Sequence, residues 1–257
     1  LIEHNSNILT KEDFKNCLMD IGIKAGDMIC VHTEIFNLGI PLLTKNEYLK
    51  ALIECFLEIL TNNGTLVMPT FSYSFCKNEI YDKNKSKCTV GLLNNFFRKL
   101  PEVTRSNDPI FSFAAYGLKA NLFQVENNSC FGKNSGYDIL TKNNAKIVYL
   151  GADWAHTFIH YIEEQIGVDY RYFKTFQGYI IDENNQKYEK KINYYVRCLD
   201  KPSELNLSTI AKLLEESGSL KKKSFGGTSI SAIDTNDFKK IIIQALNTDK
   251  YILVRKD

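Results

Sequence analysis

The segment HTFIHYIEE holds two of the chain's four histidines and follows them with two carboxylates. If residues 155–166 form a helix, each residue turns by about 100°, and His156, His160, Glu163 and Glu164 fall on one side. The opposite side is apolar and consists of Ala155, Phe158, Ile159, Ile162 and Ile166. The pattern predicts a helix that packs through its isoleucines and presents two imidazoles and two carboxylates together.

Three kinds of chemistry fit this polar side. A charged stripe on a helix is commonly a solvated surface. His156 and His160, four residues apart, could join one glutamate as the three protein ligands of a zinc site, although the H-E-x-x-H order is absent. His160 with Glu163 or Glu164 could form an acid/base pair, in which the carboxylate fixes the imidazole tautomer and raises its basicity. Spacing alone leaves all three interpretations open.

The elements around this segment predict an α/β fold. Helical patterns cover 10–22, 44–60, 90–100, 137–144, 207–220 and 235–247, and threonine caps begin the first two. Apolar strand patterns cover 27–32, 65–72, 110–117 and 145–151, with a further possible strand at 251–255. We expect one domain over 1–257, built on a central mixed, largely parallel sheet with helices on both faces. Two strand-like runs around the turn DENNQ add a β-hairpin insertion at about 178–197.

Polar residues follow three of the expected strands. They occur in VHTEIFNLG, PTFSYS and GADWAHTFIHYIEE. Ligands of such sheets collect where loops leave the carboxyl ends of the strands, so these segments are candidates for one binding site.

Composition excludes several classes of function. The chain of 257 residues is 44% apolar and 24% charged with a net charge of +2, which is typical of a globular protein. Its dispersed basic residues argue against nucleic-acid binding, and no apolar run approaches the ~20 residues of a membrane span. Seven widely spaced cysteines without a C-x-x-C pair indicate free thiols, which are typical of the reducing cytoplasm, so we expect a cytoplasmic protein. For the oligomeric state we expect either a monomer or a homodimer.

Six segments, in consistent order over residues 9–175, resemble motifs of the aminoglycoside 3-N-acetyltransferase family. They are LTKEDFKNCLMDIGIKAGDMICVHTEIFNLG, GTLVMPTFS, TRSNDPIFSFAAYG, FGKNSGYDIL with AKIVYLG, HTFIHYIEE and GVDYRYFK. Within HTFIHYIEE, His160 stands on the family histidine and Glu163 on the family glutamate. The resemblance implies direct acyl transfer from acetyl-CoA, or another acyl-CoA, to an amine without a metal. His160 would be the general base, Glu163 would orient it, and Thr157 would donate a hydrogen bond to the developing oxyanion.

The segments that resemble the family, together with the positions that depart from it, suggest binding residues. We expect the acyl-CoA to contact His32, Thr33, Leu38, Gly39, Thr70, Phe71, Arg105, Ser106 and Ser112. We expect the acceptor to contact Asp108, His156, Glu164, Tyr170 and Arg171. Some alternatives stay open, because His32 could be a buried histidine bonded to backbone and Arg105 could staple a loop. Asp108, which precedes a proline, could likewise be an Asx-turn residue.

The acceptor end departs from the family pattern. Asp108 and Phe111 replace two family histidines, and Thr33 and Glu34 replace two serines. An aminoglycoside is a polycation, whereas this chain has a net charge of +2 and a lysine-rich hairpin. These features predict N-acylation of an amino sugar linked to a nucleotide, for capsule or O-antigen synthesis. The alternative is an aminoglycoside 3-N-acetyltransferase that confers antibiotic resistance, and a zinc hydrolase or a silent CoA or sugar binder represents other classes.

Overall fold

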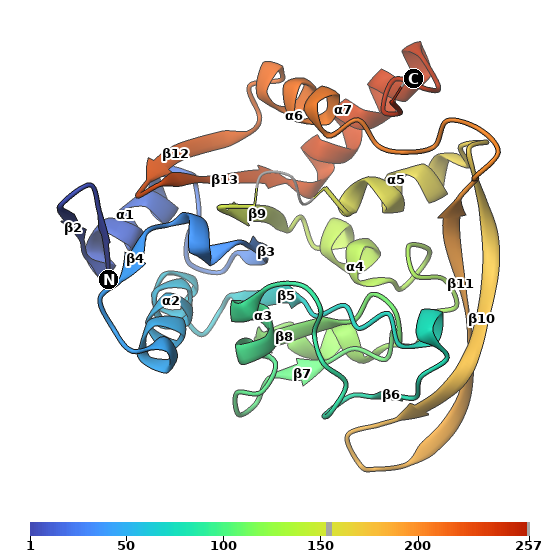
Figure 1. Cartoon of the computed structure of the whole chain (residues 1–257), viewed down its shortest axis with the longest axis horizontal. Helices are drawn as coiled ribbons and strands as arrows, with labels where there is room; N and C mark the ends of the chain where they lie inside the picture. The colour runs from blue at the N-terminus through green and yellow to red at the C-terminus, as the bar shows by residue number, and fades with distance from the viewer. Residues whose placement is uncertain (153–155, 256–257) are drawn as a thin grey trace.

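The computed structural model describes residues 1–152 and 156–255 and is built around a seven-stranded mixed sheet (Figure 1). The strand order is β12-β13-β9-β3-β5-β8-β7. Three central strands run parallel, namely β3 (Met28–Thr33), β5 (Thr65–Pro69) and β9 (Lys146–Leu150). The outer strands pair antiparallel, namely β7 (Thr104–Arg105), β8 (Phe113–Gly117), β12 (Lys221–Phe225) and β13 (Thr228–Asp234). The expected mixed sheet is confirmed, but only its centre is parallel.

Helices cover both faces of this sheet, as the alternation of its buried side chains requires. In β3, Val31 joins one apolar core with residues of α1 (Lys11–Asp20), α2 (Lys45–Leu60) and α3 (Leu92–Phe97). The neighbouring Cys30 joins a second core on the other face, to which four helices contribute: α4 (Gly136–Lys142), α5 (Phe158–Ile166), α6 (Leu207–Glu216) and α7 (Thr235–Thr248). Thr10 and Thr44 form the capping boxes that begin α1 and α2.

The expected hairpin is present but longer than predicted. Strand β10 (Arg171–Ile181) pairs antiparallel with β11 (Lys187–Arg197), and β10 also pairs parallel with the short β6 (Tyr81–Asp82). The predicted hairpin began at Gly178. In the structure it lies inside β10, where a Cβ atom would come within 2.9 Å of the Phe75 ring. The glycine therefore serves close packing rather than a turn.

Several short elements escaped prediction. The hairpin β12–β13 completes the main sheet, and a small sheet is formed by β1 (Ile2–His4), β2 (Asn7–Leu9) and β4 (Ile40–Pro41). The lysines of β12 are exposed on an edge strand, where charge discourages further pairing.

The predicted strand at 251–255 is wrong, since this segment forms turns and a single bridge from Val254 to Leu205. Short 3₁₀ helices cover Ile35–Asn37, Phe75–Lys77 and Ala120–Gln124. Across the described ranges, no helix is long and apolar enough to cross a membrane.

Candidate active site

Helix α5 brings His160 and Glu163 into direct contact one turn apart. His160 Nδ1 lies 2.7 Å from Glu163 Oε2, and Arg171 Nε lies 2.5 Å from the same oxygen. An ionised carboxylate can only accept, so Nδ1 carries the proton and Nε2 keeps its lone pair. Glu163 is fully buried, whereas the His160 side chain retains 18% exposure. Arg171 was expected to touch the acceptor, but in the structure it is a buried partner of Glu163.

The surroundings favour a neutral imidazole beside an ionised carboxylate. Burial lowers the pKa of His160 below its ordinary value, with a smaller contribution from the charge of Arg171, and Glu163 opposes the shift. Burial alone would raise the pKa of Glu163. The hydrogen bond and charge of His160, together with Arg171, nevertheless hold that pKa below its ordinary value. His160 is therefore available as a base near neutral pH.

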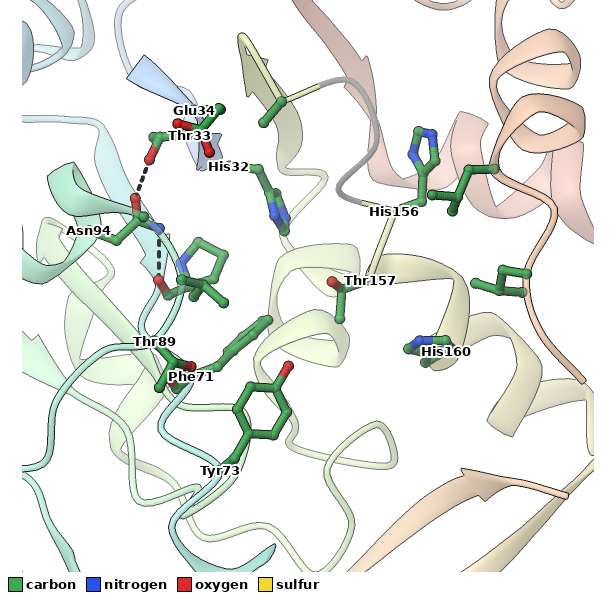
Figure 2. A pocket seen from close by; sticks show the side chains of 16 residues that line it. His32, Thr33, Glu34, Phe71, Tyr73, Thr89, Asn94, His156, Thr157 and His160 are labelled. Carbon is green, nitrogen blue, oxygen red and sulfur yellow. Dashed lines mark hydrogen bonds between the residues drawn. The ribbon is translucent and has the colours of Figure 1, made fainter. Parts of the chain in front are cut away.

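The helical wheel was partly wrong about this segment. The helix begins at Phe158, so His156 precedes it and turns its Nδ1 to within 3.2 Å of the Tyr149 hydroxyl. Figure 2 shows the rings of His156 and His160 well separated. Ile166 is exposed, while Glu163 on the expected polar side has no exposure at all. A solvated face is thereby excluded for the dyad.

A cavity of about 380 Å³ opens beside His160 (Figure 2). Its wall is formed by the carboxyl ends of β3, β5 and β9, the start of α5 and the residues that lead into α3 and α6. Its volume lies in the usual range for a small-molecule site. The lining side chains with polar or aromatic groups are His32, Thr33, Glu34, Phe71, Tyr73, Thr89, Asn94, His156, Thr157 and His160. Apolar contacts come from Pro69, Val90, Ala152, Leu205 and Leu207.

A buried amide ties together two of the strand ends. Thr33 Oγ1 donates to Asn94 Oδ1 at 2.6 Å, and Asn94 Nδ2 donates to the Pro69 carbonyl at 2.8 Å (Figure 2). Asn94 was not predicted, although a polar residue within the apolar pattern GLLNNFF was a signal for it. We infer that it positions Thr33 at the cavity wall.

Charge in the cavity is sparse. Among the described lining residues, the one side chain with a formal charge at neutral pH is the partly exposed Glu34. Burial, with a smaller effect of His156, lowers the pKa of His32 to about 3, so this imidazole is neutral. Neither Lys nor Arg belongs to the described part of the wall.

Arg105 binds backbone groups of a loop and does not line the described cavity wall. It is buried, and its Nε donates to Thr70 Oγ1 and Ser112 Oγ, both at 3.2 Å. Its terminal nitrogens donate to the carbonyls of Lys83 (3.2 Å), Ser86 (2.6 Å) and Thr70 (2.6 Å). Arg105 lies outside the described cavity wall, so its expected contact with a CoA phosphate stays a prediction, and Thr70 and Ser112 belong to the same buried network.

Three other residues of the expected CoA set also lie elsewhere. Ser106 Oγ accepts from the Phe113 backbone N–H at 3.0 Å. Leu38 is fully buried in the apolar core. Gly39 has φ +146°, and a Cβ there would come within 2.7 Å of the Glu3 carbonyl oxygen. These residues hold loops together, so only His32, Thr33 and Phe71 of this set line the cavity.

We expect Arg105→Met to lower the free energy of unfolding by at least about 2 kcal/mol, because buried carbonyls would lose a charged donor. Arg105→Lys, which keeps the charge but not the fork of donors, should also be destabilised. Chemical denaturation measures both effects. Titration calorimetry should find the same ratio of CoA to dephospho-CoA affinity in the Lys variant and the wild type. A changed ratio would place Arg105 at the phosphate site.

Asp108 forms an Asx turn in the structure and lies outside the described cavity wall. Its Oδ1 accepts from the backbone N–H groups of Ile110 (2.8 Å) and Phe111 (2.7 Å), and its Oδ2 accepts from Asn127 Nδ2 (2.8 Å). The side chain is buried away from the cavity wall. The alternative that the following proline suggested is therefore the one observed.

Tyr170 and Glu164 also lie outside the cavity. Tyr170 is fully buried and its ring lies 5.5 Å from that of Tyr251. Both oxygens of Glu164 lie 2.8 Å from the Ser129 hydroxyl, beside a separate recess. Of the five expected acceptor residues, only His156 borders the cavity that contains His160.

Within residues 1–152 and 156–255, no group of three or more His, Cys, Asp or Glu side chains could hold a metal ion. His156 and His160 do not converge, because His156 is engaged with Tyr149 and packs against Phe238. The expected metal-free reaction stays a prediction.

A sequence model of the family described as aminoglycoside 3-N-acetyltransferase matches residues 30–247, which include the dyad and the long hairpin. The chain belongs to this family. It is therefore an acyltransferase, with acetyl-CoA as co-substrate. The resemblance seen in the six motifs is confirmed.

Relatives and solved structures agree with this assignment. The SPbeta prophage-derived aminoglycoside N(3')-acetyltransferase-like protein YokD of Bacillus subtilis (strain 168) is 26% identical over 191 residues, which are 65% of this chain and 69% of the relative. The structure of AAC-IIIb in binary complex with CoASH has a TM-score of 0.80 at 18% identity and covers 94% of this chain and 97% of its own. That of AAC-VIa bound to sisomicin has a TM-score of 0.81 at 19% identity, covering 94% and 98%. At these identities the two structures support the fold.

Proposed function

We propose that this protein acetylates an amine of an aminoglycoside, with His160 as general base and Glu163 as its orienting carboxylate. The observation that carries the proposal is the 2.7 Å contact between His160 Nδ1 and Glu163 Oε2 at the edge of the cavity. The acceptor nitrogen attacks the thioester carbonyl carbon while His160 Nε2 takes up its proton. The C–S bond then breaks, and the thiolate of CoA recovers that proton from the imidazolium. An amide and free CoA result.

The acetyl-pantetheine arm fits the polar and apolar lining of this cavity. His32, Thr33 and Phe71 border it on the side of β3 and β5, and Thr157 borders it beside His160. A hydroxyl and backbone amides near strand ends suit the amide groups of pantetheine. We propose Thr157 as one donor to the oxyanion, as the family motif implies.

The charges of the site favour a cationic acceptor over an anionic one. Glu34 would attract an ammonium group, and no cation in the described wall would hold a phosphate. Two of the hairpin lysines that motivated the nucleotide-sugar hypothesis contact groups of the protein itself. Lys190 is buried with its Nζ 2.5 Å from Glu126, and Lys187 lies over the Tyr179 ring at 4.4 Å. None of the described hairpin residues lines the cavity.

We expect kcat/KM for kanamycin-like amines to exceed that for UDP-linked amino sugars by at least about 10-fold, the ratio given by one charged contact of about 1.4 kcal/mol. Release of the CoA thiol, corrected for hydrolysis without acceptor, measures both. Glu34→Gln should reduce this preference, because it removes the charge and keeps the shape. A higher kcat/KM for any nucleotide amino sugar than for every aminoglycoside tested would reverse the assignment of the acceptor.

A further inference from the structure

His32 is the last residue but one of the central strand β3, in the middle of the sheet, and it lines the cavity that contains His160. Its ring reaches into the cavity on the side of Thr157 (Figure 2). Only 6% of the residue is exposed, and its Nε2 has no hydrogen-bond partner among the residues that the structure describes. The alternative that backbone groups bond this nitrogen is therefore not supported.

An unpartnered nitrogen at this position calls for an explanation. A buried polar atom without a partner costs about 1–3 kcal/mol, so most such atoms in proteins are bonded. A partner that arrives with the substrate would remove this cost in the complex. The thioester of acetyl-CoA carries the oxygen that such a donor suits, since its carbonyl becomes negatively charged during acyl transfer.

The two histidines of the cavity have opposite surroundings. His160 is bonded to a buried carboxylate that supports a positive charge on its ring. The ring centroids of His32 and Tyr149 lie 5.8 Å apart, and His32 Nε2 has neither a carboxylate nor another hydrogen-bond partner among the described residues. Its pKa of about 3 means that it stays neutral and carries a single N–H at the pH of the reaction. In active sites with two such groups, one commonly acts as the base while the neutral one donates a hydrogen bond to the reacting carbonyl.

We infer that His32 is a second catalytic residue, whose neutral imidazole N–H donates a hydrogen bond to the carbonyl oxygen of the bound thioester. The inference rests on the proposed acyl transfer and extends it. No proton leaves His32, because the hydrogen bond only strengthens as the oxyanion forms and weakens again when the C–S bond breaks. Thr157 would be the second donor to the same oxygen, while His160 accepts the proton of the amine.

The matched variants are His32→Leu, which removes the donor at similar volume, and His32→Gln, which keeps an N–H. We expect His32→Leu to lower kcat by about 10²–10³-fold, the usual effect of removing one oxyanion donor. The affinity for desulfo-CoA, which lacks the thioester, should stay unchanged in both variants. His32→Gln should recover part of kcat. Equal kcat for the Leu and Gln variants, or a loss of desulfo-CoA affinity that matches the loss of kcat, would overturn the inference.

An acceptor-independent measurement separates this inference from the proposed function. Isotope-edited infrared spectroscopy of [1-¹³C]acetyl-CoA on the enzyme reports the polarisation of its carbonyl. We expect the bound carbonyl band to shift to lower frequency than in solution, and to lose this shift in His32→Leu but not in His160→Gln. An unshifted band on the wild type would refute the role of His32 whatever the acceptor is. A shift that depends on His32, in an enzyme that acetylates no amine tested, would sustain the role and refute the proposed function.

Discussion

The His160→Gln variant is expected to keep its fold and its CoA affinity while kcat falls by about 10²-fold or more, the usual contribution of a general base. Glutamine retains a polar side chain of similar length but cannot take up the proton of the attacking amine. Steady-state release of CoA thiol measures the loss. Gln165→Ala, an exposed change on the same helix, is the matched control and should leave kcat unchanged. Wild-type kcat in His160→Gln would remove His160 from the mechanism.

The dependence of kcat/KM on pH provides a second test of this residue. The base must be neutral, so the rate falls as the pH drops through the pKa of His160. Burial moves this pKa below its ordinary value of 6.5, so the fall should lie on the acid side of pH 6.5. In His160→Gln this acid limb should disappear. A limb that persists unchanged in the variant would assign the titration to another group.

Local features of the site could be predicted because helix geometry is local. His160 and Glu163 are three residues apart, and any helix brings such residues onto neighbouring positions. The same wheel failed for His156, because the pattern alone did not reveal that the helix begins at Phe158. The two sides of β3 were also predictable, since strand residues alternate between faces and both faces of this sheet are covered.

Non-local features could not be predicted in this way. Arg171 follows Glu163 by eight residues, yet its pairing depends on how β10 leaves α5. Asn94 reaches β3 from a helix that is 61 residues away in the chain. The sequence left Arg105 and Asp108 open between a ligand contact and a loop contact, because a residue type at a given position does not say which of the two its side chain faces. In the structure both side chains are buried and are bonded to backbone groups of loops.

The hairpin shows why net charge is a poor guide to the acceptor. Lys190 contributes to the charge of +2, but it is buried in an ion pair with Glu126. A count of charges includes such neutralised groups, whereas a ligand in the cavity responds to the side chains that line it. Glu34 stands in that wall, and its sequence position within VHTEIFNLG gave only the hint that it follows a strand.

Replacing Glu163 is expected to have the largest effect on stability. In Glu163→Gln the buried Arg171 loses the anion that lies 2.5 Å from its Nε, and breaking a buried pair on one side costs about 3–5 kcal/mol. The same change should lower kcat by about 10²-fold, because His160 loses the carboxylate that fixes its tautomer. Urea denaturation and thiol-release kinetics measure the two effects separately.

A double-mutant cycle with Arg171→Met separates charge burial from catalysis. The double variant Glu163→Gln/Arg171→Met contains neither buried charge, so it should recover most of the free energy of unfolding lost in Glu163→Gln. Its kcat should stay low, because glutamine cannot stabilise an imidazolium at His160. The folded pKa of Glu163 lies below its ordinary value of 4.5, so its stabilising effect is complete above about pH 4.5 and is lost as the pH falls through the folded pKa. The stability difference between wild type and Glu163→Gln should therefore shrink in acid. Recovery of wild-type kcat in the double variant would show that Glu163 acts only as the partner of Arg171.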